Sequence, residues 1–424
     1  MSNTGTYTEV DQRVVELRSD GEIDRGEIDD LLDSSDPVDR RAGLRALAVM
    51  TTGESADEDR DIPSLTPYLR DSDPSVRYDA VGFAGEVLRE RGDDFTAHEA
   101  LTDLLNDDSD RVAEKALDVM TDFAKQDIET ARRATGAVAG FLDSDRSEIR
   151  KLAIRFLVVV ARERPGERAI PIERLAELIG GTYDAPDYQG EQWQTAMNDT
   201  VTRQDLINHS HEERDRHMTL REFAAETLIA VADERPDDVR AHEETLRAHL
   251  RSESAHVREN ALRVYTALGD HDPTVVVAAS SEILACLDED SPESLNAAAV
   301  KPLGILVSDS PAKVVPALGD RIGPLSRLLD SDDPHVRGTA LGLLSYIADR
   351  GPEAVEPLED RIAGRLDDSE GFVRANAAWA LGALGTETAV ASLRQRRADE
   401  SSEEVRTAID EALDAADGDG PGAE

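Results

Sequence analysis

Apolar residues recur at helical spacing through most of the chain, and short polar turns interrupt them at regular intervals. After the turn at 71–73, apolar side chains return at Ala80, Val81, Ala84 and Val87. That spacing places one apolar stripe along a helix. The turn supplies side-chain oxygens for the unpaired amides of the helix start, and Pro74 suits a first helical turn, where no donor is needed. Residues 68–88 therefore predict the end of one helix, a tight turn and the start of the next.

The same leucine–turn–arginine pattern returns along the chain. In six copies the last leucine of one helix precedes an arginine by eight residues, as Leu69 precedes Arg77. Ala113 and Asn296 take the arginine position in two further copies. The repeat arginines are Arg40, Arg77, Arg150, Arg221, Arg258, Arg337, Arg374 and Arg406. A period near 37 residues with two helices per unit predicts a helical solenoid.

The phrase Pro-x-Val-Arg-x-x-Ala at 74–80, and again at 334–340, resembles the HEAT repeat in the short form also found in phycobilisome-lyase-like proteins. The resemblance covers roughly residues 24–413. It implies an all-α fold, a right-handed superhelical α-solenoid of about ten two-helix repeats. It does not define a function, because this solenoid serves many unrelated tasks.

The repeats divide the chain into five predicted parts. These are a polar N-terminal cap at 1–23, N-terminal repeats at 24–180, an insertion or degenerate repeat at 181–217, C-terminal repeats at 218–413, and a disordered acidic tail at 414–424. Residues 1–8 are also expected to be disordered, because they have nothing to bury. The first helices are expected at 11–19 and 24–32. The second helices of the next four repeats are expected at 62–69, 97–105, 130–142 and 167–179.

The period breaks between Arg150 and Arg221, which lie 71 residues apart. The additional residues include Tyr183, Tyr188 and Trp193. Such large amphipathic side chains dominate the energies of protein interfaces. We therefore expect a partner-binding insertion, and the alternative is a structural plug that fills the gap between the flanking repeats.

The charge is strongly acidic. The chain has 90 acidic and 47 basic residues, a net charge of −43, and only five of the basic residues are lysines. This composition resembles the proteins of extremely halophilic archaea, in which carboxylates keep the surface hydrated while molar salt screens their repulsion over about 3 Å. Binding to nucleic acid or to an anionic membrane is disfavoured by the same charge.

The compartment is predicted from cysteine usage and hydropathy. Cys286 is the single cysteine, so a disulfide framework is excluded and a reducing compartment is compatible. The N-terminus has no apolar signal-peptide core, and the longest apolar run, 156–161, is too short to span a bilayer. These features predict a soluble cytoplasmic protein.

Arginines form two groups with different expected roles. For the repeat arginines, the HEAT resemblance implies a buried ladder in which each guanidinium pairs with an acidic or carbonyl oxygen of the adjacent turn. Residues 314–397 are nearly neutral, and the resemblance places their second helices on the concave face. These arginines either form a groove for an acidic partner or pair with neighbouring carboxylates. They are Arg321, Arg327, Arg361, Arg365, Arg394, Arg396 and Arg397.

No catalytic or metal-binding motif accompanies the repeat. Deoxyhypusine hydroxylase, a HEAT-fold enzyme, binds two irons through His-Glu pairs that directly follow the Val-Arg phrase, and no His-Glu pair follows that phrase here. His209, His211, His217 and Asp215 match no helical metal motif, so solvated loop residues are the favoured interpretation. Nothing beyond the repeat supports lyase chemistry. No catalytic residue, metal ligand or cofactor is therefore predicted.

These observations favour a non-enzymatic scaffold or adaptor. We expect it to bind other proteins along the concave face of the solenoid and through the aromatic insertion. Two alternatives stay open at this point, an accessory protein of haloarchaeal taxis signalling and a metal-dependent or lyase-like HEAT enzyme.

Overall fold

The computed structural model of the chain describes residues 4–17, 25–51, 64–91, 98–181 and 220–418. These residues form helices joined by turns, and no β-strand occurs among them. They divide into two compact units. Unit 1 contains the described residues up to 174 together with 220–230, and unit 2 contains 175–181 and 231–418. Because each unit is built from successive helix pairs, the prediction of an all-α solenoid is confirmed.

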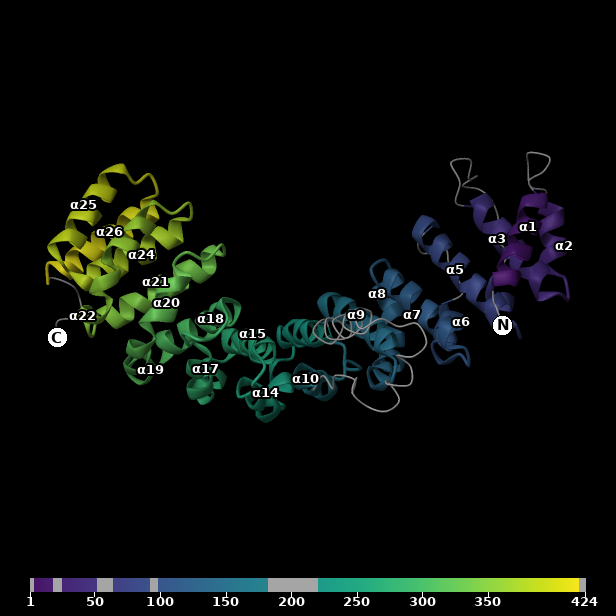
Figure 1. Ribbon diagram of the computed structural model, residues 1–424, viewed down its shortest axis with the longest axis horizontal. Coiled ribbons are helices and arrows are strands. Elements are labelled where there is room, and N and C mark those ends of the chain that lie inside the picture. The colour runs from purple at the N-terminus through teal and green to yellow at the C-terminus, as the bar shows by residue number, and fades with distance from the viewer. Residues whose placement is uncertain (1–3, 18–24, 52–63, 92–97, 182–219, 419–424) are drawn as a thin grey trace, which may run out of the picture. The chain divides into compact units, whose positions relative to one another are not determined.

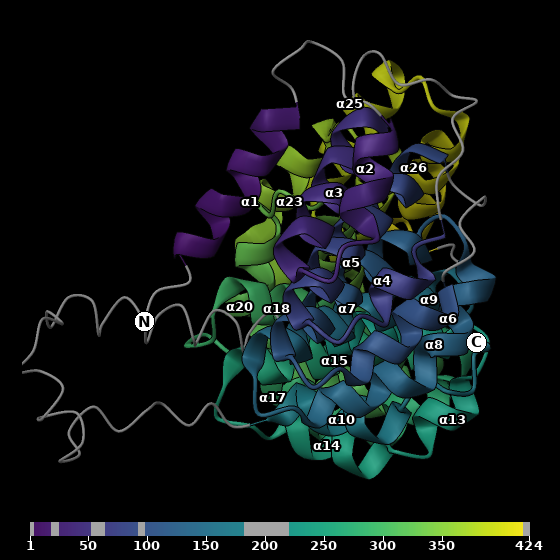
Figure 2. The ribbon, with the colours of Figure 1, turned by 90° about the vertical axis from the view of Figure 1, so that its right-hand side faces the viewer.

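The helices of unit 1 alternate between a first and a second helix in each repeat. They are α1 (Thr4–Leu17), α2 (Arg25–Leu32), α3 (Pro37–Thr51), α4 (Thr66–Leu69), α5 (Pro74–Arg91), α6 (His98–Asp103), α7 (Asp110–Ala124), α8 (Ile128–Gly140), α9 (Ser147–Glu163) and α10 (Ile172–Gly180), the last with residues in both units. Residues 220–232 are also helical. The first helices α3, α5, α7 and α9 contact one another in order (Figure 1). Helix α3 also packs against α1 and α2 (Figure 2).

Unit 2 continues the same alternation. Its helices are α13 (Pro236–Arg240), α14 (Glu243–Leu250), α15 (Ala255–His271), α16 (Pro273–Ala278), α17 (Ser280–Cys286), α18 (Glu293–Asp309), α19 (Pro311–Leu318), α20 (Ile322–Leu328), α21 (Pro334–Ala348), α22 (Pro352–Val355), α23 (Glu359–Gly364), α24 (Gly371–Leu384), α25 (Glu387–Asp399) and α26 (Glu403–Ala416). The first helices α15, α18, α21, α24 and α26 stack in this order (Figure 1).

The turns begin the first helices through side-chain caps. Asp73 accepts a hydrogen bond from the amide of Ser75 at 2.8 Å, and Asp333 accepts one from the amide of His335 at 2.8 Å. A proline follows each of these aspartates and occupies the first helical position, where its missing donor has no cost. Gly385 caps the C-terminus of helix α24, and its φ of 63° is the left-handed conformation that favours glycine.

The core lies between the two helices of each repeat and between adjacent repeats. The leucine that precedes each repeat arginine by eight residues is at most 4 % exposed in all six copies, which are Leu32, Leu69, Leu142, Leu250, Leu329 and Leu366. Burying one leucine side chain contributes about 2 kcal/mol. The repeated leucine therefore anchors each repeat in the core.

Several predicted boundaries are wrong by a few residues. Helix α1 begins at Thr4, inside the stretch expected to be disordered, because Val10 is fully buried and α1 packs against α3. Helix α4 begins at Thr66 rather than at residue 62, next to Pro67, which suits a first turn. Helix α26 ends at Ala416, three residues beyond the predicted end of the repeats at residue 413.

The second helices after α5, α7 and α9 also differ from their predicted bounds. The prediction at 167–179 is wrong at its start, since α10 begins at Ile172. Pro171 disfavours a helical conformation at Ile170, and the Glu167 carboxylate accepts the Ala169 amide at 2.9 Å within a turn. Helices α6 and α8 each tighten into a final 3₁₀ turn. Other 3₁₀ turns occur at Gly319–Arg321, Glu356–Leu358 and Arg365–Asp367.

Candidate functional site

The repeat arginines close the turn of their own repeat. Seven of the eight donate through Nη1 to the backbone carbonyl oxygen six residues earlier, and the Nη1–O distance from Arg337 to Ser331 is 2.8 Å. This satisfies a carbonyl oxygen that the preceding helix leaves unpaired. The same contact is made by Arg40, Arg77, Arg150, Arg258, Arg337, Arg374 and Arg406. The eighth, Arg221, has a pKa lowered by burial.

Four of these arginines also reach the next repeat, and we call this set of ion pairs the arginine ladder. The pairs are Arg40–Asp71 at 2.7 Å, Arg77–Asp107 at 2.6 Å, Arg337–Asp368 at 2.8 Å and Arg374–Glu400 at 2.8 Å. Each carboxylate stands six residues before the next repeat position. Asp71 illustrates the consequence, because its carboxylate accepts from Arg40 while its backbone carbonyl accepts from Arg77. One turn residue thus joins two repeats.

The ladder carboxylates are buried and ionised. The side chains of Asp368 and Glu400 are 4 % and 0 % exposed. The hydrogen bond from Arg337 holds the pKa of Asp368 below its ordinary value, and the one from Arg374 lowers the pKa of Glu400 to about 2. Removing one partner of such a pair leaves an uncompensated buried charge. The geometry therefore assigns these arginines to packing between repeats.

The ladder has gaps in the middle of the chain. Ala113 replaces the arginine and is followed by Ser144 in the carboxylate position, and Asn296 is likewise followed by Ser331. Asn296 closes its own turn by donating to the Asp288 carbonyl at 3.0 Å. Where the arginine is lost, its carboxylate partner is lost as well. This paired loss is visible in the sequence and marks the gaps, although the spacing of the repeats does not reveal it.

The second-helix arginines pair across repeats. Arg361 and Arg365 both contact Asp330, at 2.5 and 2.7 Å, and Arg321 contacts Asp288 at 2.9 Å. The remaining contacts are Arg327 with the Glu289 carbonyl, Arg396 with Asp367 and Glu400, and Arg397 with Asp410. Arg394 is exposed and makes no ion pair within the described part of the chain. This arrangement favours pairing inside the protein over a groove for an acidic partner.

The predicted contact residues of the insertion lie outside the described residues. Tyr183, Tyr188 and Trp193 fall in 182–219, as do the histidines at 209, 211 and 217. Their role as a partner contact stays a prediction.

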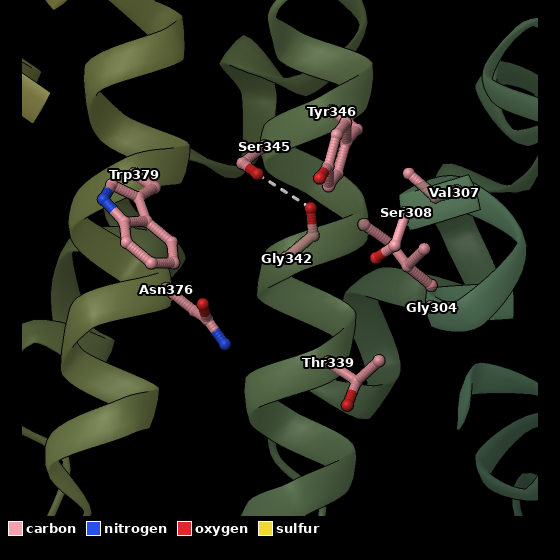
Figure 3. A pocket seen from close by; sticks show the side chains of 10 residues that line it. Gly304, Val307, Ser308, Thr339, Gly342, Ser345, Tyr346, Asn376 and Trp379 are labelled. Carbon is pink, nitrogen blue, oxygen red and sulfur yellow. Dashed lines mark hydrogen bonds between the residues drawn. The ribbon is translucent and has the colours of Figure 1, made fainter. Parts of the chain in front are cut away.

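A groove that sequence reasoning missed crosses three first helices of unit 2. It encloses about 560 Å³ and is lined from α18, α21 and α24. Figure 3 shows Tyr346 and Trp379 on neighbouring helices, with Gly342 between them on the face of α21. The remaining lining residues are Gly304, Val307, Ser308, Thr339, Leu343, Ser345 and Asn376. None of the ten lining side chains carries a charge.

The repeat register explains the shape of this groove. Gly342 and Trp379 both stand five residues after a repeat arginine, so a large ring on α24 lies one repeat from a glycine on α21. A Cβ atom at Gly342 would meet nothing within 4 Å, so the position is open. Seven other repeats place a charged residue here, which are Arg45, Asp118, Arg155, Glu226, Arg263, Lys301 and Glu411. At this position Gly82, Gly342 and Trp379 are uncharged, and Trp379 is the one aromatic residue.

Aromatic side chains at this surface are unusually exposed. Tyr346, Phe372 and Trp379 are 41 %, 40 % and 44 % exposed, and among the described residues the other exposed large hydrophobic side chains are two valines. Phe372 stacks on His335 with ring centroids 5.1 Å apart. Trp379 and Phe372 also line a second hollow of about 370 Å³ between α24 and α26. The two hollows adjoin at Trp379.

The described residues were also compared with the requirements of a metal site and of a membrane-spanning helix. No three histidine, cysteine, aspartate or glutamate side chains among them are placed to hold a metal ion together. No helix in the same ranges is both long and apolar enough to cross a membrane.

Comparison with known proteins identifies the repeat. A family model of HEAT repeats matches residues 28–121 and 323–414. These two stretches are HEAT repeats. All four ladder pairs fall inside them; of the two gaps, Ala113 also falls inside and Asn296 falls between them. No curated protein sequence matches the chain significantly.

One solved structure shares the fold, and the karyopherin Kap121p is a weaker match. The crystal structure of an engineered protein matches with a TM-score of 0.62 at 18 % identity, over 96 % of this chain and 99 % of that one. The karyopherin Kap121p matches with a TM-score of 0.45 at 13 % identity, over 92 % of this chain and 45 % of that one. Kap121p bound to Pho4p matches with a TM-score of 0.43 at 12 % identity, over 98 % of this chain and 50 % of that one. This chain thus spans half of the Kap121p length or less.

Proposed function

We propose that this protein is a non-enzymatic scaffold that binds other proteins, and that the groove across α18, α21 and α24 is a principal contact surface. The observation that carries the proposal is an uncharged groove edged by Tyr346 and Trp379 in a chain of which 32 % of residues are charged. Uncharged apolar patches with a polar surround mark interaction sites, and aromatic residues concentrate the energy of protein interfaces.

The lining of the groove supports binding rather than catalysis. Tyr346 is its only titratable side chain, and histidine, cysteine, lysine and carboxylate groups are absent from the lining. These are the groups that general acid–base and nucleophilic chemistry use. The hydroxyls of Thr339 and Ser345 each donate at 2.8 Å to a carbonyl oxygen of their own helix, which leaves them unactivated.

The aromatic insertion is a second proposed contact of the same scaffold. Its support is composition alone, since Tyr183, Tyr188 and Trp193 are the side chains that interfaces favour. Of the seven arginines predicted on the second helices of 314–397, Arg394 is the one whose guanidinium has neither an ion pair nor a hydrogen bond among the described residues. Both surfaces are tested alongside the groove.

Site-specific photo-crosslinking tests the proposal. The photoreactive residue p-benzoylphenylalanine replaces Trp379 or Tyr346 in the full chain, and cross-linked proteins from the native host are identified by mass spectrometry. Val49 provides the matched control, because it also stands nine residues after a repeat arginine and is 37 % exposed against 41 % for Tyr346. Further variants carry the label at Trp193 and at Arg394.

We expect the same partner at 346 and 379 and none at 49. With that partner purified, Trp379→Ala weakens binding at least about tenfold, which corresponds to about 1.4 kcal/mol. Equal cross-linking at 49, or unchanged affinity in Trp379→Ala with intact circular dichroism, contradicts the groove as the contact. Cross-linking confined to 193 or 394 instead moves the contact to the insertion or to the second-helix face.

A further inference from the structure

The hollow between α24 and α26 differs from the uncharged groove because two carboxylates line it. Phe372 and Trp379 of α24 form one wall, and Glu404 and Glu411 of α26 stand on the other. The two glutamates are seven residues apart, so they lie about 10 Å apart along one face of the helix. Ala375 and Val405 supply an apolar floor between the walls. Two carboxylates and two aromatic rings therefore surround the same space.

These two carboxylates have no cation of their own. Within the described ranges, Glu404 and Glu411 are exposed and form no ion pair, whereas Asp410 on the same helix pairs with Arg397. Arg374, near one end of the hollow, is held by Glu400 through two hydrogen bonds at 2.8 and 3.1 Å. No basic side chain lines the hollow. The local charge is therefore negative and uncompensated.

We propose that this hollow binds a lysine or arginine side chain of a partner protein, whose adjoining apolar residues occupy the uncharged groove. The inference rests on the proposed scaffold function and states the chemistry of the partner segment. A cation is attracted to the face of tryptophan, the most effective aromatic side chain for this contact, and the two glutamates neutralise its charge. The long alkyl stem of lysine or arginine covers the apolar floor while its charged end stays near the carboxylates.

Other occupants fit the hollow poorly. Each undescribed segment of more than three residues carries more acidic than basic residues, and a second copy of the chain brings a net charge of −43. Nucleic acid and anionic lipid meet the same repulsion from Glu404 and Glu411. A single metal ion cannot be shared by two carboxylates that stand two helical turns apart, because metal–oxygen distances are close to 2 Å. Charge complementarity therefore selects a basic protein segment.

The chain offers a direct fluorescent reporter. It contains two tryptophans, so Trp193→Phe leaves Trp379 as the only one. Three synthetic twelve-residue peptides are titrated into this full-length variant, one of leucine, serine and lysine, one with every lysine acetylated, and one with glutamate in place of lysine. The buffer contains about 1 M KCl, in which the Debye length is about 3 Å, so long-range attraction to the acidic chain is screened.

We expect the lysine peptide to change the Trp379 emission and to bind at least about tenfold more tightly than the acetylated peptide, since acetylation removes the charge but keeps the stem. The glutamate peptide should produce no change. Glu404→Gln combined with Glu411→Gln should remove that preference. The matched control combines Glu403→Gln with Asp414→Asn, exposed residues of α26 outside the hollow, and should retain it.

Equal responses to the lysine and acetylated peptides, including no response to either, overturn the proposal. Equal losses in both double variants overturn it as well, because they indicate an effect of overall charge rather than of this hollow. These outcomes can be distinguished from a failure of the proposed scaffold function. Partner cross-linking at 346 and 379 without a lysine preference leaves the scaffold intact and removes only the cation site.

Discussion

Repeats with a closed arginine ladder and repeats with gaps differ in how their turns are joined. Between α21 and α24 the Arg337 guanidinium makes two hydrogen bonds to Asp368, at 2.8 and 2.9 Å. Between α15 and α18 the Arg258 guanidinium contacts only carbonyl oxygens of its own turn, at Ser252 and Glu253, and its buried Nε has no partner in the described structure. The first helices stack in both places. Apolar burial therefore suffices for stacking, and the ladder adds a specific link.

An ionic link between second helices joins the repeat of α15 to the repeat before it. Arg247 and Arg251 of α14 both hold Glu282 of α17, and the Arg247–Glu282 distance is 2.9 Å. Burial alone would raise the pKa of Glu282, but these two arginines and Ser281 lower it to about 2. Such second-helix links also occur at closed junctions, because Arg396 of α25 contacts Asp367 at 3.2 Å, beside the Arg337–Asp368 pair. Stacking of the repeats therefore depends on a continuous apolar core. A buried ionic contact between the turns is an addition that some junctions lack.

The largest expected effect comes from breaking a closed junction. Arg337→Ala leaves the buried Asp368 carboxylate without its guanidinium, which should cost about 3 kcal/mol in the free energy of unfolding of α21 and α24. Arg258→Ala removes only carbonyl contacts and should cost under about 1 kcal/mol. Native-state hydrogen exchange in the first helices measures both. Equal costs would contradict the distinction between closed junctions and gaps.

A smaller effect, with a defined pH dependence, is expected at Glu400. Glu400→Gln keeps the shape but removes the charge that Arg374 and Arg396 share, which should cost about 2 kcal/mol at neutral pH. Because the folded pKa is lowered from 4.5 to about 2, the carboxylate contributes stability above pH 4.5 and loses it as the pH falls through about 2.

The measurement compares urea unfolding of the wild-type protein and Glu400→Gln across this pH range. Their difference in unfolding free energy should shrink steadily below pH 4.5, because protonation converts the wild-type side chain into a neutral one. A difference that stays constant down to about pH 2 would show that the charge of Glu400 is not the source of the effect.

The ladder can also be extended into a gap. Ala113→Arg combined with Ser144→Asp places a guanidinium on α7 and a carboxylate in the turn before α9, at the two ladder positions, where Ala113 is 7 % exposed. We expect a favourable coupling of about 1 kcal/mol in a double-mutant cycle, with each single change neutral or destabilising. Additive effects of the two substitutions would mean that the gap has a geometry the ladder cannot bridge.

The smallest effect is expected on the second-helix surface. Arg327 is exposed and donates to the Glu289 carbonyl at 2.9 Å, so Arg327→Ala should change the free energy of unfolding by less than about 0.5 kcal/mol. Thermal unfolding of this variant beside Arg337→Ala provides the comparison. A loss as large as that of Arg337→Ala would show that the second-helix pairs, and not the ladder, hold this part of unit 2 together.

Much of the fold was predictable because its signals are local. Leu69 and Arg77 belong to one turn and the helices on either side of it, so burial and capping within a few residues define the repeat. Boundaries were less predictable where proline intervened, as at Pro171, which delays α10 to Ile172. The groove was missed because the repeats were aligned only by arginine, whereas the position five residues later distinguishes Trp379 from the charged residues of other repeats.

By itself the sequence determined the repeat length, the helix–turn–helix unit and the buried leucine of each copy, because these depend on contacts within one repeat. Only the tertiary structure decided which charges are used internally, since the carboxylates that hold Arg337 and Arg365 lie 31 and 35 residues away in adjacent repeats. It also decided that Trp379 faces an open glycine on α21 and two glutamates of α26. Such juxtapositions arise when separate repeats stack, and no single repeat contains them.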